Sequence, residues 1–478
     1  MIKRMIAGIV CVGLIVPIAE HETRAFDSNS IVSGVGDIGG AETVGIANTA
    51  RAIKLGGAMN KISDGLDIAL SKALSLMPGG SEPNSSNTTA SSPNNVIPPQ
   101  NTSQPPAAAA PKTPEQCIAE LPRAKRIGQV IMPGTFATTL QRDAVIFKQN
   151  SVGNAIIMTA PANLNDGSIN KFKTDAGNSM LVATDVEGGL VDRFKGLSSI
   201  PTPEAVASTL PATDDQATLD AKHSRDVAIE YNKHSTVPRT VPIISAEGLI
   251  ADRSQKLSDI GVSMVFGPLA DVGPVGKHGA MGNRVFSDKP TTVATYVRSY
   301  IDGWKKGDIM AVIKHFPGNG STLVNTDSAS ATTPPLAQLK ARDWKPYEQL
   351  ASPSTSIMVG NQIVPDWTQD LPSSLSSVVY TQARQYAGPN GLLITDSLTA
   401  KAITVPVPEA ITKALIAGAD IALYTNDKDN PTKTAQTLAD SVKAIDAAVT
   451  SNKYPETQLN ASVARVLAAK KQPACSMN

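Results

Sequence analysis

Beyond residue 115, short apolar runs alternate with longer stretches of helical periodicity. Each apolar run is rich in Val, Ile and Leu and ends at a turn or a charged residue, which is typical of a buried strand. The predicted strands are residues 128–132, 155–159, 181–184, 240–244, 262–266, 310–313, 356–359, 392–395 and 421–424. Helical patterns lie between them, most clearly at residues 293–306, 337–350 and 407–417.

This alternation of strand and helix continues over roughly 350 residues and predicts a parallel α/β domain. A TIM-type (β/α)8 barrel fits that length. A doubly wound sheet is the alternative, but no G-x-G-x-x-G string follows an early strand. We therefore expect residues 115–478 to form a TIM-type barrel domain.

The first 114 residues have a different character. Residues 1–25 combine a charged start, a short apolar run and small residues before a cleavage point, which predicts a signal peptide; an uncleaved anchor is the alternative. Residues 26–77 show a weak helical pattern and predict a small helical segment. Residues 78–114 are rich in Pro, Ser and Asn and predict a disordered linker. We expect a secreted or cell-envelope-associated protein, tethered to a membrane or wall through its N-terminal segment.

Composition limits the partners and the chemistry. The 43 basic and 42 acidic residues nearly cancel, which argues against nucleic acid as a partner. The five histidines are scattered without ligand spacing, so we predict neither a metal site nor a cofactor. Outside the signal peptide two cysteines remain, Cys117 and Cys475, which bracket the predicted domain. In an exported protein such a pair favours a disulfide over two free thiols.

Charged residues follow four of the predicted strands. They are Asp185 and Glu187, then Asp271 with Arg284 on the same loop, then Lys314 and His315, and finally Asp396. The carboxyl ends of the strands meet at one face of a parallel barrel, so these side chains predict a polar pocket there. Any one of them alone could be a turn residue or a core histidine, but four strand ends together favour a substrate site.

These strings, in this order, resemble glycoside hydrolase family 3, particularly its single-barrel β-N-acetylglucosaminidases of the NagZ type. The matching stretches are ATDVEGGLVDRF (183–194), FGPLADV (266–272), GNRVFSDKP (282–290), KHFPGNG (314–320), ITDSLTAKAI (394–403) and LNASVARVLAAKK (459–471). The resemblance covers residues 115–471. It implies a barrel fold and a retaining mechanism through a covalent glycosyl-enzyme.

The resemblance also implies roles for individual residues. Asp396 matches the nucleophile, and neighbouring cations are expected to keep it ionised at neutral pH. The residues matching those that hold the sugar's hydroxyl and N-acetyl groups are Asp185, Arg193, Arg284, Lys314 and His315. Glu187 and Asp271 are expected to support the loops.

The loop expected to carry the general acid/base departs from the family pattern. The family reads KHFPGHGDT and then, two residues on, Asp-Ser-His, whereas here Asn319 and Ser321 interrupt the first string. Asp327 stands at or near the position of the missing histidine, depending on the alignment. Leu190, Ala400 and Asn361 replace an expected arginine, methionine and histidine elsewhere.

Three interpretations of this loop remain open. Asp327 serves as the acid/base after burial raises its pKa, or His278 supplies the proton from the loop at 272–282, or the chain is a degenerate relative. The first two predict an exported glycosidase that releases N-acetylglucosamine from peptidoglycan-derived glycans. The third predicts a pseudoenzyme that binds envelope glycan or a protein partner. A transferase or phosphorylase is a further alternative.

Overall fold

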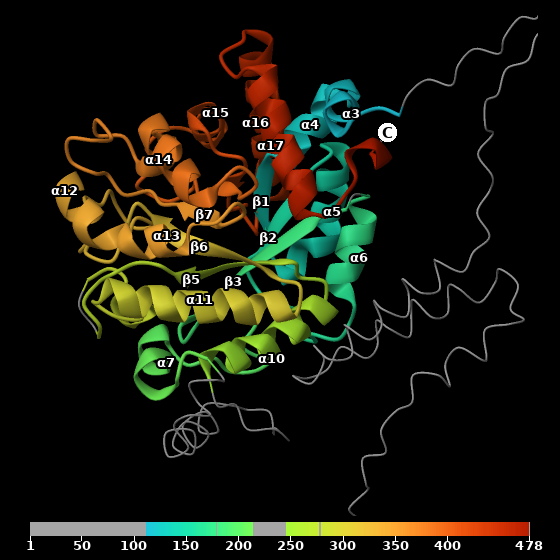
Figure 1. Ribbon diagram of the computed structural model, residues 1–478. Coiled ribbons are helices and arrows are strands. Elements are labelled where there is room, and N and C mark those ends of the chain that lie inside the picture. The colour runs from blue at the N-terminus through green and yellow to red at the C-terminus, as the bar shows by residue number, and fades with distance from the viewer. Residues whose placement is uncertain (1–110, 178, 214–244, 277–278, 478) are drawn as a thin grey trace, which may run out of the picture. The chain divides into compact units, whose positions relative to one another are not determined.

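The computed structural model describes residues 111–177, 179–213, 245–276 and 279–477 (Figure 1). The predicted signal peptide and helical segment, most of the predicted linker, the predicted strand at 240–244 and His278 lie outside these ranges. None of the described helices is long and apolar enough to cross a bilayer.

In the described part of the chain, eight parallel strands surround a common axis (Figure 1). In spatial order they are β8 (Leu393–Thr395), β7 (Ser356–Val359), β6 (Met310–Phe316), β5 (Met264–Leu269), β3 (Leu181–Gly188), β2 (Asn154–Ile157), β1 (Ile131–Thr135) and β9 (Ala422–Tyr424). A parallel bridge between Ile394 and Ile421 joins the two ends of this order. The short strand β4 (Val191–Asp192) forms a hairpin with β3. The predicted TIM-type (β/α)8 barrel is confirmed.

Side chains along the strands alternate between two apolar cores, as the two-residue period of a strand requires. Met264 and Phe266 belong to a cluster to which every one of the eight strands or its flanking residue contributes, so this cluster fills the barrel. Val265, between them, belongs to the larger cluster that joins the strands to the helices. Because both faces are buried, the strands read as continuous apolar runs in the sequence.

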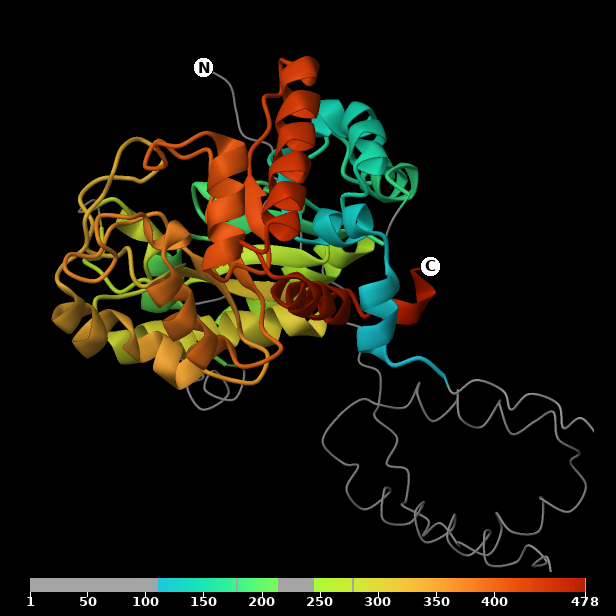
Figure 2. The same ribbon diagram turned by 90° about the horizontal axis from the view of Figure 1, so that it is seen from above.

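Helices cover the outside of the barrel (Figures 1 and 2). They are α3 (Pro114–Glu120), α4 (Arg123–Gln129), α5 (Leu140–Gln149), α6 (Ser168–Asp175), α7 (Pro203–Thr209), α10 (Ala246–Asp259), α11 (Pro290–Lys306), α12 (Leu336–Gln338), α13 (Lys345–Leu350), α14 (Ser377–Ala387), α15 (Val407–Ala417), α16 (Pro431–Thr450) and α17 (Glu456–Ala469). Short 3₁₀ turns are η2 (Ala137–Thr139), η3 (Gly282–Arg284), η5 (Ser373–Leu375) and η6 (Ala474–Ser476). Helices α10 and α11 lie side by side, and α11 also packs on β6.

Two predicted elements are wrong in detail. The strand predicted at 128–132 begins only at Ile131, because Gly128 and Gln129 end helix α4. A Cβ on Gly128 would lie 2.0 Å from the carbonyl oxygen of Ser151, so this glycine permits close packing of a helix. The helix predicted at 337–350 is interrupted by a π-helical turn, η4 (Leu339–Asp343). Pro346 has no N–H to donate to the preceding turn, so a regular helix cannot run through this point.

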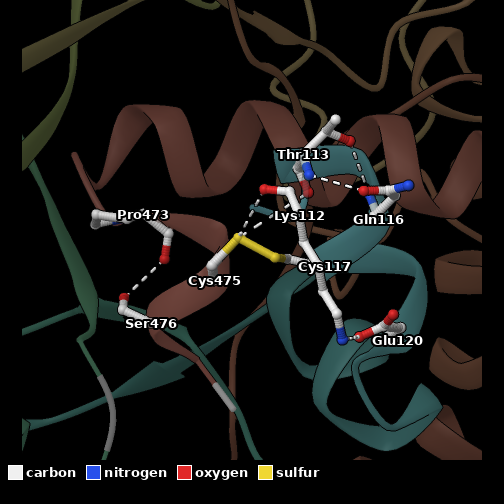
Figure 3. Close-up of a disulfide and its surroundings, with 8 residues drawn as sticks. All are labelled: Lys112, Thr113, Gln116, Cys117, Glu120, Pro473, Cys475 and Ser476. Atoms are coloured by element: carbon white, nitrogen blue, oxygen red, sulfur yellow. Dashed lines mark hydrogen bonds and ion pairs between the residues drawn. A yellow bond between two sulfur atoms is a disulfide. The ribbon is translucent and has the colours of Figure 1, made fainter. Parts of the chain in front are cut away.

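The two ends of the described chain are joined covalently. Cys117 in α3 forms a disulfide with Cys475 in η6, with their Cα atoms 5.0 Å apart (Figure 3). Thr113 begins α3 by accepting a hydrogen bond from the backbone N–H of Gln116 at 3.3 Å. Figure 2 shows α3 beside the C-terminal turn. The predicted disulfide is therefore present.

Candidate active site

A cavity of about 420 Å³ opens at the carboxyl ends of the strands. Its volume lies within the range of about 300–1,000 Å³ that small-molecule sites occupy. Side chains of the barrel core, including Phe266 and Met358, form its apolar floor. The seven residues predicted for catalysis and substrate binding all line this cavity: Asp185, Arg193, Arg284, Lys314, His315, Asp327 and Asp396. The barrel thus brings together residues from β3, from β6 and from the segments that follow β4, β5, β6 and β8, which are up to 211 positions apart, from Asp185 to Asp396.

One wall of the cavity is a cluster of paired charges. Lys314 Nζ lies 3.0 Å from Asp185 Oδ1 and 2.6 Å from Glu187 Oε1. Arg284 donates two hydrogen bonds to the Glu187 carboxylate, at 2.8 and 2.9 Å. Arg193 Nε lies 3.7 Å from Asp185 Oδ2. These pairs fix the two strand-end carboxylates of β3 against cations from β6 and from two loops.

Burial and pairing set the charge states in this cluster. Burial alone would raise the pKa of Glu187, but Lys314 and Arg284 outweigh it and lower that pKa to about 2. Burial would lower the pKa of Lys314, but Glu187 and Asp185 outweigh it and raise that pKa. Glu187 and Lys314 are therefore ionised at neutral pH, and the cluster offers strong hydrogen-bonding groups to sugar hydroxyls.

His315 is held in one orientation by Asp271, as expected for a supporting carboxylate. Its Nδ1 lies 2.7 Å from Asp271 Oδ2. The other oxygen of Asp271 accepts a hydrogen bond from the backbone N–H of Asn319 at 2.6 Å. With Nδ1 engaged, Nε2 is the ring nitrogen left for a ligand. Asp271 thus couples the imidazole to the start of the loop after β6.

Asp396 lies at the end of β8 and is partly exposed to the cavity. Its backbone N–H donates to the carbonyl of Val359, and its Oδ1 accepts from the N–H of Ser397 at 2.7 Å. Burial raises its pKa above the usual value, and the charge of Asp327 adds to this. His315 and Lys314 lower the pKa of Asp396, but they do not outweigh burial.

The turn that follows Asp396 is held by Asn361. Asn361 is buried, and its side-chain amide donates to the carbonyl of Ser397 at 2.9 Å. Its Oδ1 accepts from the hydroxyl of Ser374 at 2.6 Å. Asn361 therefore completes a satisfied hydrogen-bond network behind the carboxylate.

Asp327 lies on the loop between β6 and α12, and this loop rests on the segment after Asp396. The N–H of Ala402 donates to the carbonyl of Thr326 at 3.0 Å, and the N–H of Lys401 donates to the carbonyl of Asp327 at 3.4 Å. Asn325 Oδ1 accepts from the N–H of Asp327 at 2.9 Å, which forms a tight turn. These bonds place Asp327 at the cavity, but the residue is exposed, so the burial that was expected for it is absent. The other predicted proton source, His278, lies outside the described residues.

Several residues of the candidate site have no sequence pattern that would have predicted them. Asn325, Thr326, Thr399 and Thr425 line the cavity but look like ordinary loop residues. Two further residues that the sequence did not single out, Arg342 and Asp343, lie in the predicted helix at 337–350. Arg342 donates to the hydroxyl of Ser321 at 2.5 Å and pairs with Asp343. The π-helical turn that presents both side chains could not be foreseen from periodicity.

Comparison with known proteins assigns the family. Residues 123–469 match the model described as the glycosyl hydrolase family 3 N terminal domain. Beta-hexosaminidase LpqI of Mycobacterium tuberculosis is 28% identical over 321 residues, which span 65% of this chain and 73% of that protein. A beta-hexosaminidase of Xylella fastidiosa is 28% identical over 293 residues, which span 59% of this chain and 77% of that protein.

Solved structures of glycosyl hydrolase family 3 proteins also match this chain. A glycosyl hydrolase of family GH3 from Mycobacterium smegmatis superposes with a TM-score of 0.61 at 28% identity, covering 74% of this chain and 98% of that one. The structure of M. tuberculosis LpqI superposes with a TM-score of 0.62 at 26% identity, covering 75% and 96%. The family match extends over nearly the whole described domain, so the chain belongs to glycosyl hydrolase family 3 and is a glycoside hydrolase.

Proposed function

We propose that the chain is a retaining β-N-acetylhexosaminidase that releases β-linked N-acetylglucosamine from cell-envelope glycans, with peptidoglycan fragments as the substrate class. One observation carries this proposal. Asp396 and Asp327 line the same cavity as the cluster of Lys314, Asp185 and Arg193. Two carboxylates and a sugar-binding wall are the parts that a retaining glycosidase needs. The names of the relatives as beta-hexosaminidases support the choice of sugar.

In the first step, Asp396 attacks the anomeric carbon while the bond to the leaving oxygen breaks and Asp327 gives that oxygen a proton. In the second step, Asp327 takes a proton from water as the water oxygen attacks the same carbon, and the Asp396 ester is released. Lys314 and His315 bind the sugar beside Asp396 and favour its ionised form. Because burial raises the Asp396 pKa, activity is expected to depend on Lys314 and His315.

The first test is to trap the glycosyl-enzyme. The full chain is incubated with a fluorinated N-acetylglucosaminyl donor bearing a very good leaving group, and the intact mass is measured. A mass gain of one sugar in the wild type and in the exposed control Asp370→Asn, but not in Asp396→Asn, is expected. An intact fold without any adduct would contradict catalysis on this sugar. Binding screens with envelope glycans would then test the pseudoenzyme alternative.

The second test concerns the proton donor. Asp327→Ala is expected to cleave an activated aryl glycoside measurably but an alkyl glycoside roughly 10²–10⁴-fold more slowly than the wild type does. Added azide should restore turnover on the aryl substrate, because the azide anion attacks the anomeric carbon of the glycosyl-Asp396 ester directly, forms a glycosyl azide and needs no base. If Asp327→Ala retains wild-type rates on the alkyl glycoside, another group supplies the proton, and His278→Ala becomes the next variant.

We also propose that the protein is exported and stays with the cell envelope. The disulfide between Cys117 and Cys475 supports this, because such bonds persist in oxidising compartments. Fractionation of cells that express the full chain, with thiol labelling of each fraction before and after reduction, tests the proposal. Recovery of the chain in the cytoplasm with two labelled thiols in the domain would contradict it.

A further inference from the structure

The loop after β6 begins with a tightly held segment, residues 317–322. The backbone N–H of Asn319 donates to Asp271 at 2.6 Å, and Asn319 itself lines the cavity. The hydroxyl of Thr322 bonds to the carbonyl and to Oδ1 of Asn319, at 2.9 and 2.6 Å. The carbonyl of Thr322 accepts from the N–H of Ala280 at 2.9 Å. These bonds fix the segment to the chain that follows β5.

The π-helical turn η4 holds the same segment from a different part of the chain. The guanidinium of Arg342 donates to the hydroxyl of Ser321 at 2.5 Å. It also donates to both oxygens of the Asp343 carboxylate, each at 3.0 Å, and such a two-point pair fixes the plane of the guanidinium. A Cβ on Gly318 would lie 2.7 Å from the Cβ of Asp343, so the backbone of the segment rests directly on this buried side chain.

The position of Asp327 depends on how the loop backbone is held. Asp327 is exposed and lies six positions after Ser321, so packing of its own side chain contributes little to its placement. The backbone at Asp327 is bonded to Lys401 and Ala402, and the other support is the segment at 317–322. A general acid must stay within hydrogen-bond reach of the leaving oxygen, and a displacement of about 1 Å can cost about 100-fold in rate.

We propose that Arg342 is a positioning residue for the general acid: through Ser321 it holds the start of the loop so that Asp327 meets the leaving-group oxygen. This inference rests on the proposed function. Arg342 lies outside the cavity lining, so it acts on the place of the acid and not on the substrate. Loss of Arg342 should therefore weaken proton donation far more than attack by Asp396.

Two N-acetylglucosaminides with different leaving groups separate these effects. An aryl glycoside with a very good leaving group needs little proton donation, whereas an alkyl glycoside needs a proton on its leaving oxygen. The ratio of their kcat/KM values, alkyl over aryl, does not depend on how much of the enzyme is folded. In the full-length Arg342→Met variant this ratio should fall about tenfold to hundredfold. Ser321→Ala should lower the ratio too, whereas Ser321→Thr, which keeps the hydroxyl, should not.

The matched control is Arg298→Met. Arg298 is an exposed arginine that donates to the carbonyl of Gln349 at 3.3 Å and lies outside the cavity lining, so its loss should keep the wild-type ratio. A second comparison asks whether Arg342 acts through the acid. Adding Arg342→Met to Asp327→Ala should leave the ratio of Asp327→Ala unchanged, because the group to be positioned is already missing.

The outcomes distinguish this inference from the proposed function. A wild-type ratio in Arg342→Met would overturn the positioning role and leave the proposed function standing. A further fall of the ratio in Asp327→Ala/Arg342→Met would also overturn it, because Arg342 would then act by another route. Cleavage of neither glycoside by a folded wild type would overturn both proposals.

Discussion

The salt bridge between Glu187 and its two cations makes the strongest prediction about stability. The Glu187 side chain is fully buried, and it contacts Lys314 Nζ at 2.6 Å and Arg284 Nε at 2.8 Å. Its pKa is lowered from 4.5 to about 2, a difference of about 2.5. At about 1.36 kcal/mol per pKa unit, this corresponds to roughly 3 kcal/mol of unfolding free energy at neutral pH. Removing one partner of a buried ion pair costs about 3–5 kcal/mol in other proteins.

Glu187→Gln should therefore lower the unfolding free energy by roughly 3 kcal/mol at pH 7, measured by urea denaturation with coincident circular dichroism and fluorescence transitions. The folded pKa lies below the unfolded one, so the stabilisation is complete above about pH 4.5 and is lost as the pH falls towards 2. The gap between wild type and variant should shrink over that window.

The control for this prediction is Glu409→Gln, which removes an exposed pair with Lys413. It should change stability by less than about 0.5 kcal/mol. A loss below about 1 kcal/mol for Glu187→Gln, or a gap between wild type and variant that does not depend on pH, would refute the reasoning.

Three further predictions concern stability. Cys117→Ser/Cys475→Ser removes a bridge between residues 358 positions apart and should cost about 2–5 kcal/mol in urea denaturation, an effect that a reductant should reproduce in the wild type. Burial lowers the pKa of Lys470 to about 7, so above pH 7 the unfolded chain binds a proton that the native state does not. The free energy of unfolding should therefore rise with pH from about 7 to 10 because of this group. Lys470→Met should flatten that part of a plot of Tm against pH. Burial, opposed by Arg342, raises the pKa of Asp343 to about 7, so the native state keeps a proton that the unfolded chain releases. The contribution of this group to the free energy of unfolding should therefore fall as the pH rises from about 4 to 7. Asp343→Asn should remove this fall from a plot of Tm against pH. If the slope of Tm against pH is unchanged in Lys470→Met or in Asp343→Asn, the pKa shift assigned to that residue is wrong.

The candidate site shows how well short motifs, occurring in a fixed order along the sequence, predict which residues line the cavity. All seven predicted site residues line one cavity, because the carboxyl ends of parallel strands meet whatever their separation in the sequence. The expected support roles of Glu187 and Asp271 also agree with their contacts to Lys314 and His315. What each residue does in catalysis stays a prediction until the variants are measured.

The sequence by itself determined the barrel, the disulfide partners and the residues at the strand ends. Each follows from a local signal: apolar runs with a period, a pair of cysteines, or charges that stop a strand. The limits of local signals show at Gly128 and Gln129, which the pattern assigns to the start of a strand but which end helix α4.

Only the tertiary structure decided the electrostatics of the site and the surroundings of the loop after β6. Burial raises the Asp396 pKa despite the nearby Lys314 and His315, and burial depends on what packs around a group. The contact of Arg342 with Ser321 joins a π-helical turn to that loop across 21 residues. Such effects depend on distances between elements remote in the chain, which neither periodicity nor composition encodes.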